Sequence, residues 1–433
     1  MPQSLVKPIC SHEELEEFSR LREEPAWLLT QRSSALQRFL QGPAPDRAAH
    51  LWRYSDPAQF EPAAPLWGGV AVPKSANAPA SAKSAAAPEL SAEAQEKGVI
   101  LLSLAAAAAH PEYGPLVQQH LGALVGAEFG RFEALNQALW RHGLFLLVPK
   151  GVQLAEELSL DFSSARSETC RLLAFIGERA EVTLVERHHD AMSTTAAGRK
   201  EATRGGDAAH QLYGVSEIFA GAASRLTHLL VQTMNQGTVA HLTQRIRLAK
   251  DAHALSSILS LGAKSMKLDT GTLLAGEGSE VETIGLLYGR GRQAFDHHTV
   301  HHHSAPHTNS NLDFKAVVTG RARSAYTGNI TIEKEAPFSS AYQQNNNLLL
   351  SEKARAESIP ELEIKIDEVQ CSHGATVGQI DPDELFYLMS RGIPEKEAVR
   401  QIVRGFLEAI LQRVPEKLQD PLREELDSRL QEI

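Results

Sequence analysis

The feature that most constrains the fold is a succession of short alternating segments between about residues 164 and 370, with no helical pattern between them. In these segments apolar residues recur at every second position, which is the period of a strand with one buried face. Breaks rich in glycine or asparagine separate them, such as Gly276-Glu277-Gly278, Gly289-Arg290-Gly291 and Gly328-Asn329. Many short strands without intervening helices are typical of a β-sandwich, a β-barrel or a β-solenoid. The periodicity alone leaves these three open.

Helical patterns flank the β region on both sides. Residues from about 11 to 41 predict two helices interrupted at Pro25, and the C-terminal segment predicts three, of which the first stops at Gly392. We therefore expect a mainly helical N-terminal domain over residues 1–155, a β core over 156–378 and a helical C-terminal domain over 379–433. An Ala/Ser/Pro-rich stretch near residues 73–98 indicates a linker or loop inside the first domain.

Cys371 and His373 stand where the strand pattern gives way to the helical one. Because alternate residues of an extended chain point to the same side, both side chains could contact one ligand. Two ligands do not make a closed metal site, which normally needs four. A buried thiol beside a hydrogen-bonded imidazole is the simpler interpretation of the two residues taken alone.

A second group of imidazoles lies inside the β region, from His297 to His307. On a strand His301 and His303 would share a face, so a metal site of the cupin kind, with Asp296 as the nearby carboxylate, is one hypothesis. Imidazole clusters also form polar layers and interface contacts, and this alternative remains open. The polar run Asn345-Asn346-Asn347 would suit an asparagine ladder, in which equal residues stack on successive turns of a solenoid.

Charge, cysteine content and missing motifs exclude several classes. The formal net charge of −10 argues against a nucleic-acid or anionic-membrane binder, and three cysteines do not form a disulfide framework. With no apolar run that could span a bilayer and no signal-peptide pattern at the N-terminus, we expect a cytoplasmic protein. The sequence also lacks the phosphate-binding loop G-x-x-x-x-G-K-[ST], the G-x-S-x-G elbow and H-E-x-x-H, so we expect neither an ATPase nor another enzyme of these kinds.

Five separated motifs resemble the SufB/SufD family of the SUF iron–sulfur cluster assembly system, and together they cover most of the chain. They are Leu51-Trp52-Arg53-Tyr54, LNQALWRHGLFLLVPKGV at 135–152, QNNNLLL at 344–350, CSHGATVG at 371–378 and DELFYLMSRGI at 383–393. The octet resembles the SufD branch, whereas the SufB branch tends to read H-E-A-T-T-S there. Asn345 stands where the SufB branch characteristically has a cysteine.

This resemblance implies a right-handed parallel β-helix flanked by helical domains. It also implies a scaffold subunit without ATPase activity, which pairs with a SufB-like paralogue and binds a SufC-like ABC ATPase. The docking surface for the ATPase would lie on the C-terminal helices, and our candidates for it are Asp383, Glu384, Tyr387, Arg391, Glu397 and Arg400. A homodimer of the isolated chain and a flavin in the complex also remain open.

The resemblance makes His373 the first candidate ligand for iron or for a transient cluster shared with the partner, and Cys371 the second. Neutral imidazole is a competent iron ligand. His301 and His303 are weaker candidates, for a metal or for a subunit interface. Two other interpretations remain: a cupin-like metalloenzyme that uses the His297–His307 cluster, and a purely structural adaptor that contributes no ligand.

Overall fold

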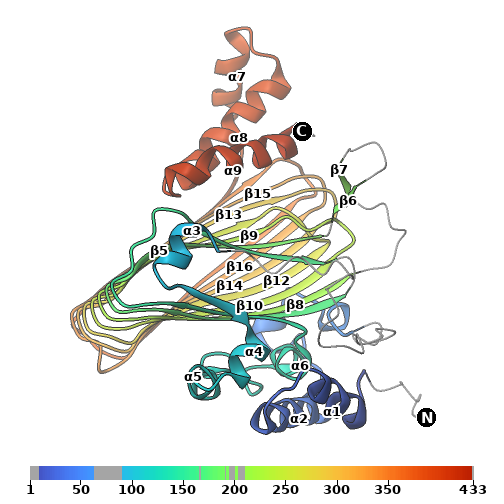
Figure 1. Ribbon diagram of the computed structural model, residues 1–433. Coiled ribbons are helices and arrows are strands. Elements are labelled where there is room, and N and C mark those ends of the chain that lie inside the picture. The colour runs from blue at the N-terminus through green and yellow to red at the C-terminus, as the bar shows by residue number, and fades with distance from the viewer. Residues whose placement is uncertain are drawn as a thin grey trace.

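The computed structural model describes residues 9–62, 90–164, 167–190, 192–194, 200–202 and 210–431. At its centre two large sheets lie face to face, and the chain passes from one to the other after almost every strand (Figure 1). Apart from β1, which is antiparallel to β2, the strands of both sheets pair in parallel. This is a parallel β-solenoid, and it confirms the mainly-β class and the flanking helices that the sequence and its resemblance predict.

Sheet A has nine strands and sheet B has eight. In spatial order sheet A contains β1 (Ile100–Ser103), β2 (His142–Val148), β4 (Glu168–Ile176), β8 (Gln211–Ala220), β10 (Val239–Leu248), β12 (Ser265–Leu274), β14 (Ala294–His303), β16 (Arg323–Ile332) and β18 (Arg355–Ile364). Sheet B contains β3 (Leu158–Ser164), β5 (Glu181–Asp190), β9 (Arg225–Gln232), β11 (His253–Ser260), β13 (Glu280–Gly289), β15 (Asn309–Val318), β17 (Ser339–Leu349) and β19 (Val369–Gln379). A short hairpin, β6 (Met192–Thr194) and β7 (Lys200–Ala202), lies outside both sheets.

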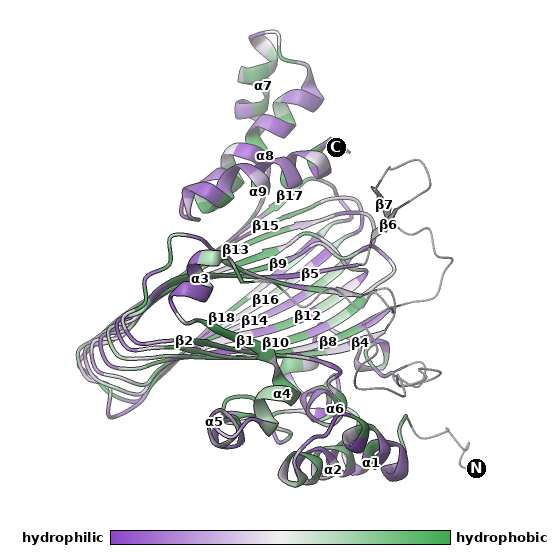
Figure 2. Ribbon diagram, viewed as in Figure 1, coloured by the Kyte–Doolittle hydropathy of each residue, from purple (hydrophilic) through white to green (hydrophobic). Residues whose placement is uncertain are grey.

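The period-2 pattern of each strand places one row of side chains inside the solenoid and the other outside. The inner rows of both sheets supply most of the main hydrophobic core, for example Leu242 and Leu268 from sheet A and Leu226 and Leu312 from sheet B. Such burial of apolar surface is the main stabilising contribution to a fold of this kind. The outer rows meet helices or solvent, and Figure 2 shows both green and purple segments along the strands.

The turns that lead into successive strands of sheet B also stack in register. The parallel register aligns one residue near the start of each of these strands, and the residue two positions before it has a positive φ. These residues are Arg179, Ala223, Asp251, Gly278, His307 and Phe338. Left-handed backbone costs a non-glycine residue on the order of 1 kcal/mol. The same backbone shape therefore recurs at each turn even where the residue is not the glycine that would favour it.

N-terminal helices cover the outer face of sheet A. They are α1 (His12–Leu21), α2 (Ala26–Gln41), α4 (Leu104–Ala109), α5 (Gly114–His120) and α6 (Arg131–Leu139), with 3-10 turns at His50–Trp52 and Pro57–Gln59. Ser11 and Glu14 form a capping box at the start of α1, and Pro25 separates the first two helices as predicted. A further α-helix of this part, α3 (Ala92–Glu96), packs through Ala94 on the core at the first end of the solenoid.

The segment from Leu51 to Phe60 lies against sheet A. Trp52 is buried, and the Lys267 ammonium lies 4.8 Å from the centre of its ring. The Ser55 hydroxyl donates a 2.7 Å hydrogen bond to Asp296, whose other carboxylate oxygen lies 2.8 Å from Nε2 of His298. This buried network attaches the N-terminal segment to the outer face of the solenoid.

C-terminal helices cover part of the opposite face. α8 (Glu395–Leu411) and α9 (Glu416–Leu430) pack apolar residues such as Leu407 and Leu422 on the outer row of sheet B. α7 (Pro382–Ser390) projects beyond them and has no buried residue (Figure 1). Gly392 has a φ of 87° and ends this helix as predicted. None of the helices in the described part of the chain combines the length and apolar character needed to cross a bilayer.

Two predictions differ from the structure or lie partly outside it. The asparagine ladder is wrong, because the parallel register sets Asn345 beside Phe314 and Ala375, and Asn347 beside Ala316 and Val377. Residues 73–89 of the predicted linker lie outside the described residues, while residues 92–96 near its end form α3.

Candidate functional site

The two sheets end together at β18 and β19, the last strands of the solenoid. In the described chain β18 pairs only with β16, and β19 only with β17, so each strand has one unpaired backbone edge. Ile364 and Val377 belong to the inner rows, yet they are 42% and 49% exposed because no further turn covers them. We call this surface the open end of the solenoid. Free strand edges with apolar side chains are typical of a surface that pairs with another chain.

Cys371 and His373 lie on β19 at this open end. The register aligns Cys371 with Ala341 and His373 with Gln343, and these two residues of β17 are buried in the solenoid. The inner row of β19 therefore carries both candidate ligands, as their two-residue spacing predicts. His373 is exposed and Cys371 is half-buried. Both side chains thus stand on the last layer of the interior, where a partner can reach them.

The Cys371 thiol and the His373 imidazole differ in how easily each can act as a metal ligand. Burial raises the pKa of the Cys371 thiol above its ordinary value, so the protonated form predominates at neutral pH. A thiol binds metal as the thiolate, and this site makes deprotonation less favourable. The His373 ring is exposed, so an incoming metal ion can reach its nitrogen atoms. The local environment thus favours His373 over Cys371 as the ligand.

Polar groups form the layer directly beneath; the sequence singled out Asn345 and Asn347 for a ladder, and Gln343 not at all. Gln343 lies under His373, and its Nε2 donates a 3.3 Å hydrogen bond to the carbonyl of Gly328. The amide of Asn345 donates to the carbonyl of Phe314 at 3.1 Å, and that of Asn347 donates to Asn345 Oδ1 at 2.7 Å. These bonds hold the residues beneath β19 in place. Their signal in the sequence was the alternation of Gln343, Asn345 and Asn347.

The histidine cluster is split between the two sides of β14. His297, His301 and His303 lie on the inner row, and their rings bond to hydroxyl groups of Ser260, Thr283, and Thr308 with Ser310. Asp296, His298 and His302 point to the outer side. The structure therefore does not bring Asp296 together with His301 and His303, and that part of the metalloenzyme hypothesis is wrong because neighbouring strand residues face opposite ways. Among the described residues no group of three or more His, Cys, Asp or Glu is arranged to hold a metal ion.

Burial of these imidazoles makes stability depend on pH. It lowers the pKa of His297 and His301 to about 3 and that of His303 to about 4. In the unfolded chain the same rings take up protons near pH 6.5. Their contribution to stability is therefore complete above about pH 6.5 and is lost as the pH falls toward 3 to 4.

We expect the free energy of unfolding to fall more steeply between pH 6.5 and 4.5 in the wild type than in His301→Gln. Each ring that is neutral only in the folded state contributes a slope of about 1.4 kcal/mol per pH unit well below its unfolded pKa. Urea unfolding at several pH values measures the slope. His302→Gln, on the outer side of the same strand, is the matched control. Equal slopes in His301→Gln and the wild type would contradict the assignment.

A buried ionic cluster was missed at the sequence level. Inside the first turns of the solenoid Glu186 Oε1 lies 2.8 Å from Nε2 of His188 and accepts a 2.7 Å hydrogen bond from Ser216, and Oε2 lies 3.3 Å from Nε2 of His228. Burial alone would raise the pKa of Glu186, but the two imidazoles lower it below the ordinary value. Its only signal in the sequence was the position of Glu186 and His188 on the inward row of a strand.

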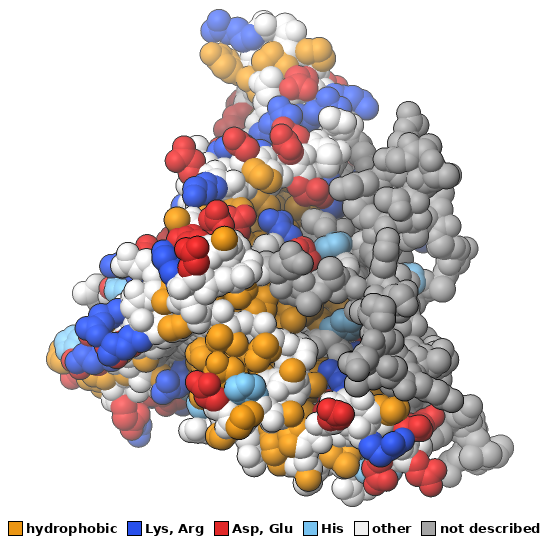
Figure 3. All heavy atoms as spheres, viewed as in Figure 1, with side chains coloured by type: hydrophobic (Ala, Val, Ile, Leu, Met, Phe, Trp, Pro, Cys, Tyr) orange, Lys and Arg blue, Asp and Glu red, His pale blue; other side chains and the backbone are white. Residues whose placement is uncertain are grey.

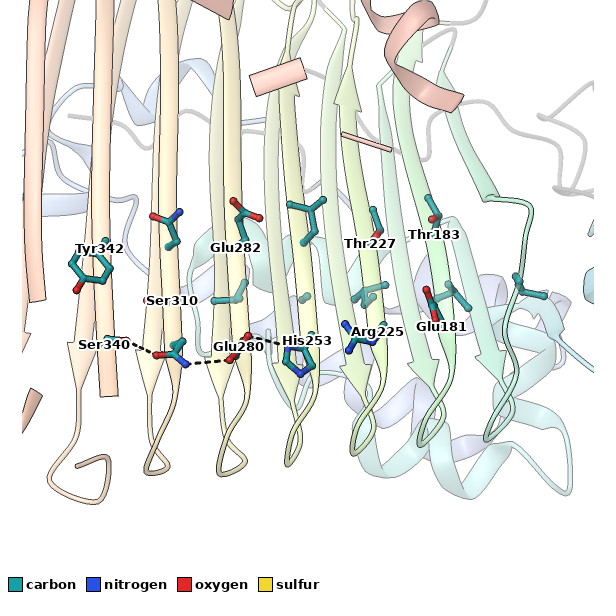
Figure 4. A pocket seen from close by; sticks show the side chains of 18 residues that line it. Glu181, Thr183, Arg225, Thr227, His253, Glu280, Glu282, Ser310, Ser340 and Tyr342 are labelled. Carbon is teal, nitrogen blue, oxygen red and sulfur yellow. Dashed lines mark hydrogen bonds and ion pairs between the residues drawn. The ribbon is translucent and has the colours of Figure 1, made fainter. Parts of the chain in front are cut away.

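A groove of about 630 Å³ crosses the outer face of sheet B near the turns (Figure 4). One polar row runs along it: His253 lies 3.1 Å from Glu280, which accepts a 3.2 Å hydrogen bond from Asn309, and Ser340 donates to Asn309. These bonds join four neighbouring strands in register. The polar row therefore stabilises sheet B by linking the side chains of neighbouring strands.

The predicted ATPase-docking residues fall into two groups. Asp383, Glu384, Tyr387 and Arg391 are on or beside α7, and the Arg391 guanidinium lies 5.2 Å from the Tyr387 ring centre. Glu397 and Arg400 form a 3.3 Å ion pair on α8, and Arg400 also donates to the carbonyl of Leu430.

The sequence did not single out the apolar part of α7. Phe386 is 71% exposed and Met389 42% exposed, in a region where Figure 3 shows apolar and basic side chains together at the tip of the C-terminal helices. An exposed aromatic residue on a projecting helix is typical of a protein-binding surface.

The fold and the open end define a class: a parallel β-solenoid that presents a thiol and an imidazole beside free strand edges. Comparison with known proteins agrees. The sequence profile of the family described as "SUF system FeS cluster assembly, SufBD core domain" matches residues 162–406. The chain belongs to the SufBD family of the SUF iron–sulfur cluster assembly system.

Named relatives support this membership. A SufBD family protein of Synechocystis is 31% identical over 302 residues, a match covering 68% of this chain and 65% of the cyanobacterial protein. The Bacillus subtilis iron–sulfur cluster assembly protein SufD is 28% identical, with 95% of both chains covered. A family protein of Staphylococcus haemolyticus is 25% identical over 92% of this chain and 88% of its own. The chain is thus similar to SufD over nearly its whole length.

Proposed function

We propose that this chain is a SufD-like, non-enzymatic scaffold subunit that acts in the cytoplasm and contributes a ligand to iron or a nascent iron–sulfur cluster at an interface with a SufB-like paralogue. The observation that carries the proposal is the position of His373, exposed on the inner row of the last strand at the open end. Iron and sulfide are the cargo of this site. Flavin binding by the complex stays a prediction.

Pairing at the open end would complete the site. Each free strand edge offers backbone donors and acceptors to a partner strand, and the exposed Ile364 and Val377 offer apolar surface to be covered. His373 would then lie between two solenoids, where a cysteine or carboxylate of the paralogue can supply the remaining ligands. Because the neighbouring Cys371 thiol is held protonated, we assign it the secondary role.

The C-terminal helices would connect this site to a SufC-like ATPase. α8 and α9 pack on sheet B as far as Leu348 of β17, the strand that pairs with β19, so a movement of α7 could reach the open end through β17. Closure of a nucleotide-bound ATPase pair would shift the two solenoids relative to each other and change access to His373. The chain itself would hold the cluster site in place and contribute a ligand, and ATP hydrolysis by the ATPase would supply the energy for the movement.

Anaerobic co-purification with the SufB-like paralogue and the ATPase tests the proposal directly. We expect a complex that contains all three chains, with iron and acid-labile sulfide in the presence of a sulfur donor. A chain that forms the complex but whose substitution at the open end leaves iron and sulfide unchanged would be the structural adaptor. Tight metal binding by the isolated chain that is lost in His301→Ala would instead favour the metalloenzyme.

Phe386→Asp is expected to weaken binding of the ATPase by about 2 kcal/mol, or roughly thirtyfold, because an exposed aromatic side chain of the proposed docking surface is replaced by a charge. Isothermal titration calorimetry with the purified ATPase measures the change. Leu40→Asp is the matched control, since Leu40 is 47% exposed on α2 in the other helical layer. Unchanged affinity of Phe386→Asp would exclude α7 from the docking surface.

A further inference from the structure

We propose that Gln343 is a positioning residue for His373: its side-chain carbonyl accepts a hydrogen bond from one nitrogen of the imidazole ring, which leaves the other nitrogen to face an incoming iron ion. This inference rests on the proposed ligand role of His373 and adds the group that orients the ring. Both residues lie on the inner row of sheet B, His373 in the last layer of the solenoid and Gln343 in the layer beneath it.

The carboxamide of Gln343 is fixed in place by its surroundings. Gln343 is 3% exposed, and its Nε2 donates the 3.3 Å hydrogen bond to the carbonyl of Gly328 on the facing sheet. Gly328 leaves the space that the carboxamide fills, because a Cβ atom there would lie 2.2 Å from Nε2 and 2.8 Å from Oε1. A glycine inside a strand often marks such a close approach. The side chain therefore reaches across the interior in one defined position.

One atom of this carboxamide is left unsatisfied. Gln343 Oε1 is buried and has no hydrogen-bond partner among the described residues. A buried acceptor without a partner costs about 1–3 kcal/mol, and native structures contain few of them. A donor that reaches Oε1 would recover this free energy. Gln343 is thus prepared to accept a hydrogen bond.

The neighbours of Gln343 leave His373 as the donor. β17 lies between β15 and β19, and the register sets the apolar Leu312 on one side of Gln343 and His373 on the other. Along the same row the Asn345 amide already donates to the carbonyl of Phe314. The His373 ring has no partner within the described part of the chain. Adjacent strands are about 4.8 Å apart, so rotation of this exposed ring about its side-chain torsions can bring a nitrogen to Oε1.

A hydrogen bond to one ring nitrogen decides what the other can do. Neutral imidazole carries a proton on one nitrogen and a free lone pair on the other. When the protonated nitrogen donates to Gln343 Oε1, the lone pair is held on the side of the ring away from the carboxamide. Histidine ligands are generally held by such a bond, and loss of the acceptor typically lowers metal affinity by roughly 10–100-fold. Gln343 would thus orient the His373 ring before iron arrives.

Two substitutions in the full-length chain test the bond itself. Gln343→Met keeps the length of the side chain and removes the acceptor, whereas Gln343→Glu keeps an acceptor oxygen. Proton–nitrogen NMR spectra of a chain with isotope-labelled histidine report which nitrogen of each ring is protonated, and the signals lost in His373→Ala identify this ring. At about pH 8, where an ordinary imidazole is neutral, we expect one tautomer of His373 to predominate in the wild type and in Gln343→Glu, and a mixture in Gln343→Met.

Two controls and one functional readout complete the experiment. Gln344→Met makes the same chemical change on the exposed outer row of β17 and should give the wild-type tautomer. The signals of the buried His297 and His301 should stay unchanged in every variant, which reports an intact interior. In the three-chain complex we expect Gln343→Met to lower iron and acid-labile sulfide on the order of tenfold and Gln343→Glu to retain most of both.

The outcomes separate this inference from the proposed function. An unchanged His373 tautomer in Gln343→Met overturns the inference. Normal iron loading of Gln343→Met also overturns it, provided that His373→Ala lowers the loading. If His373→Ala itself loads normally, the proposed ligand role fails, while the NMR comparison still supports or overturns the bond between Gln343 and His373.

Discussion

His373→Ala is expected to lower the iron and acid-labile sulfide of the three-chain complex at least about tenfold, the range that even substitutions around a metal ligand produce. The reason is geometric: the imidazole stands on the exposed last layer of the interior, and alanine leaves no donor there. Iron and sulfide assays on anaerobically purified complexes measure the loss.

The controls for this variant use its neighbours. Ser372→Ala changes the adjacent residue on the outer row and should load like the wild type. Cys371→Ser should reduce loading less than His373→Ala does, since the thiol is held protonated. Equal iron and sulfide in His373→Ala and wild-type complexes of unchanged composition would contradict the ligand role and favour the structural adaptor.

Glu217→Ala is expected to lower the free energy of unfolding by about 3–5 kcal/mol, because it leaves a buried arginine without its counter-ion. Arg171 and Glu217 are completely buried, with a 2.7 Å contact between guanidinium and carboxylate. The same carboxylate accepts hydrogen bonds from the amides of Gly122, Leu124 and Val125. One residue thus joins sheet A to the loop between α5 and α6.

Urea unfolding monitored by tryptophan fluorescence measures this loss, since Trp140 lies buried in the adjoining helical layer. Glu178→Ala, which breaks the exposed ion pair with Lys150, should be indistinguishable from the wild type. Replacing both partners, as in Arg171→Met/Glu217→Leu, should restore part of the lost stability, since no unpaired charge then remains. A loss below about 1 kcal/mol in Glu217→Ala would show that water reaches the arginine.

The strands could be located from the sequence, but their pairing could not. A period of two identifies a strand wherever one face is buried, and the apolar residues from Leu312 to Val318 follow this period along β15. Parallel pairing joins β15 to β13 and β17, which are separated from it along the chain by strands of the other sheet. Nothing local in β15 specifies those neighbours, so the choice of a solenoid came from the family resemblance. β1, a short strand ahead of an alanine-rich helix, was missed.

The candidate site was also predictable only in part, because spacing shows which residues share a face of a strand but not which residues of other strands lie beside them. Spacing alone placed Cys371 and His373 on one face, and the structure adds that this face is the uncovered end of the interior. Spacing also contained the signal that Asp296 and His301 face opposite ways, since they are an odd number of residues apart on one strand. The polar residues beneath His373 could not be assigned to it beforehand, because their contact depends on the register between β17 and β19.

The two ends of the solenoid are unequal, and this difference limits how far association can proceed. At the first end Ala94 of α3 and the antiparallel strand β1 lie against the core, whereas β18 and β19 leave the other end open. A repeating stack of identical solenoids needs two complementary free ends, as in the growth of a fibre. β1 and β3 also end their sheets with one neighbour each, but α3 covers the core beside them, so the burial of uncovered interior residues favours a partner at the open end alone. The fold can therefore expose interior residues at one end with little tendency to form a repeating stack.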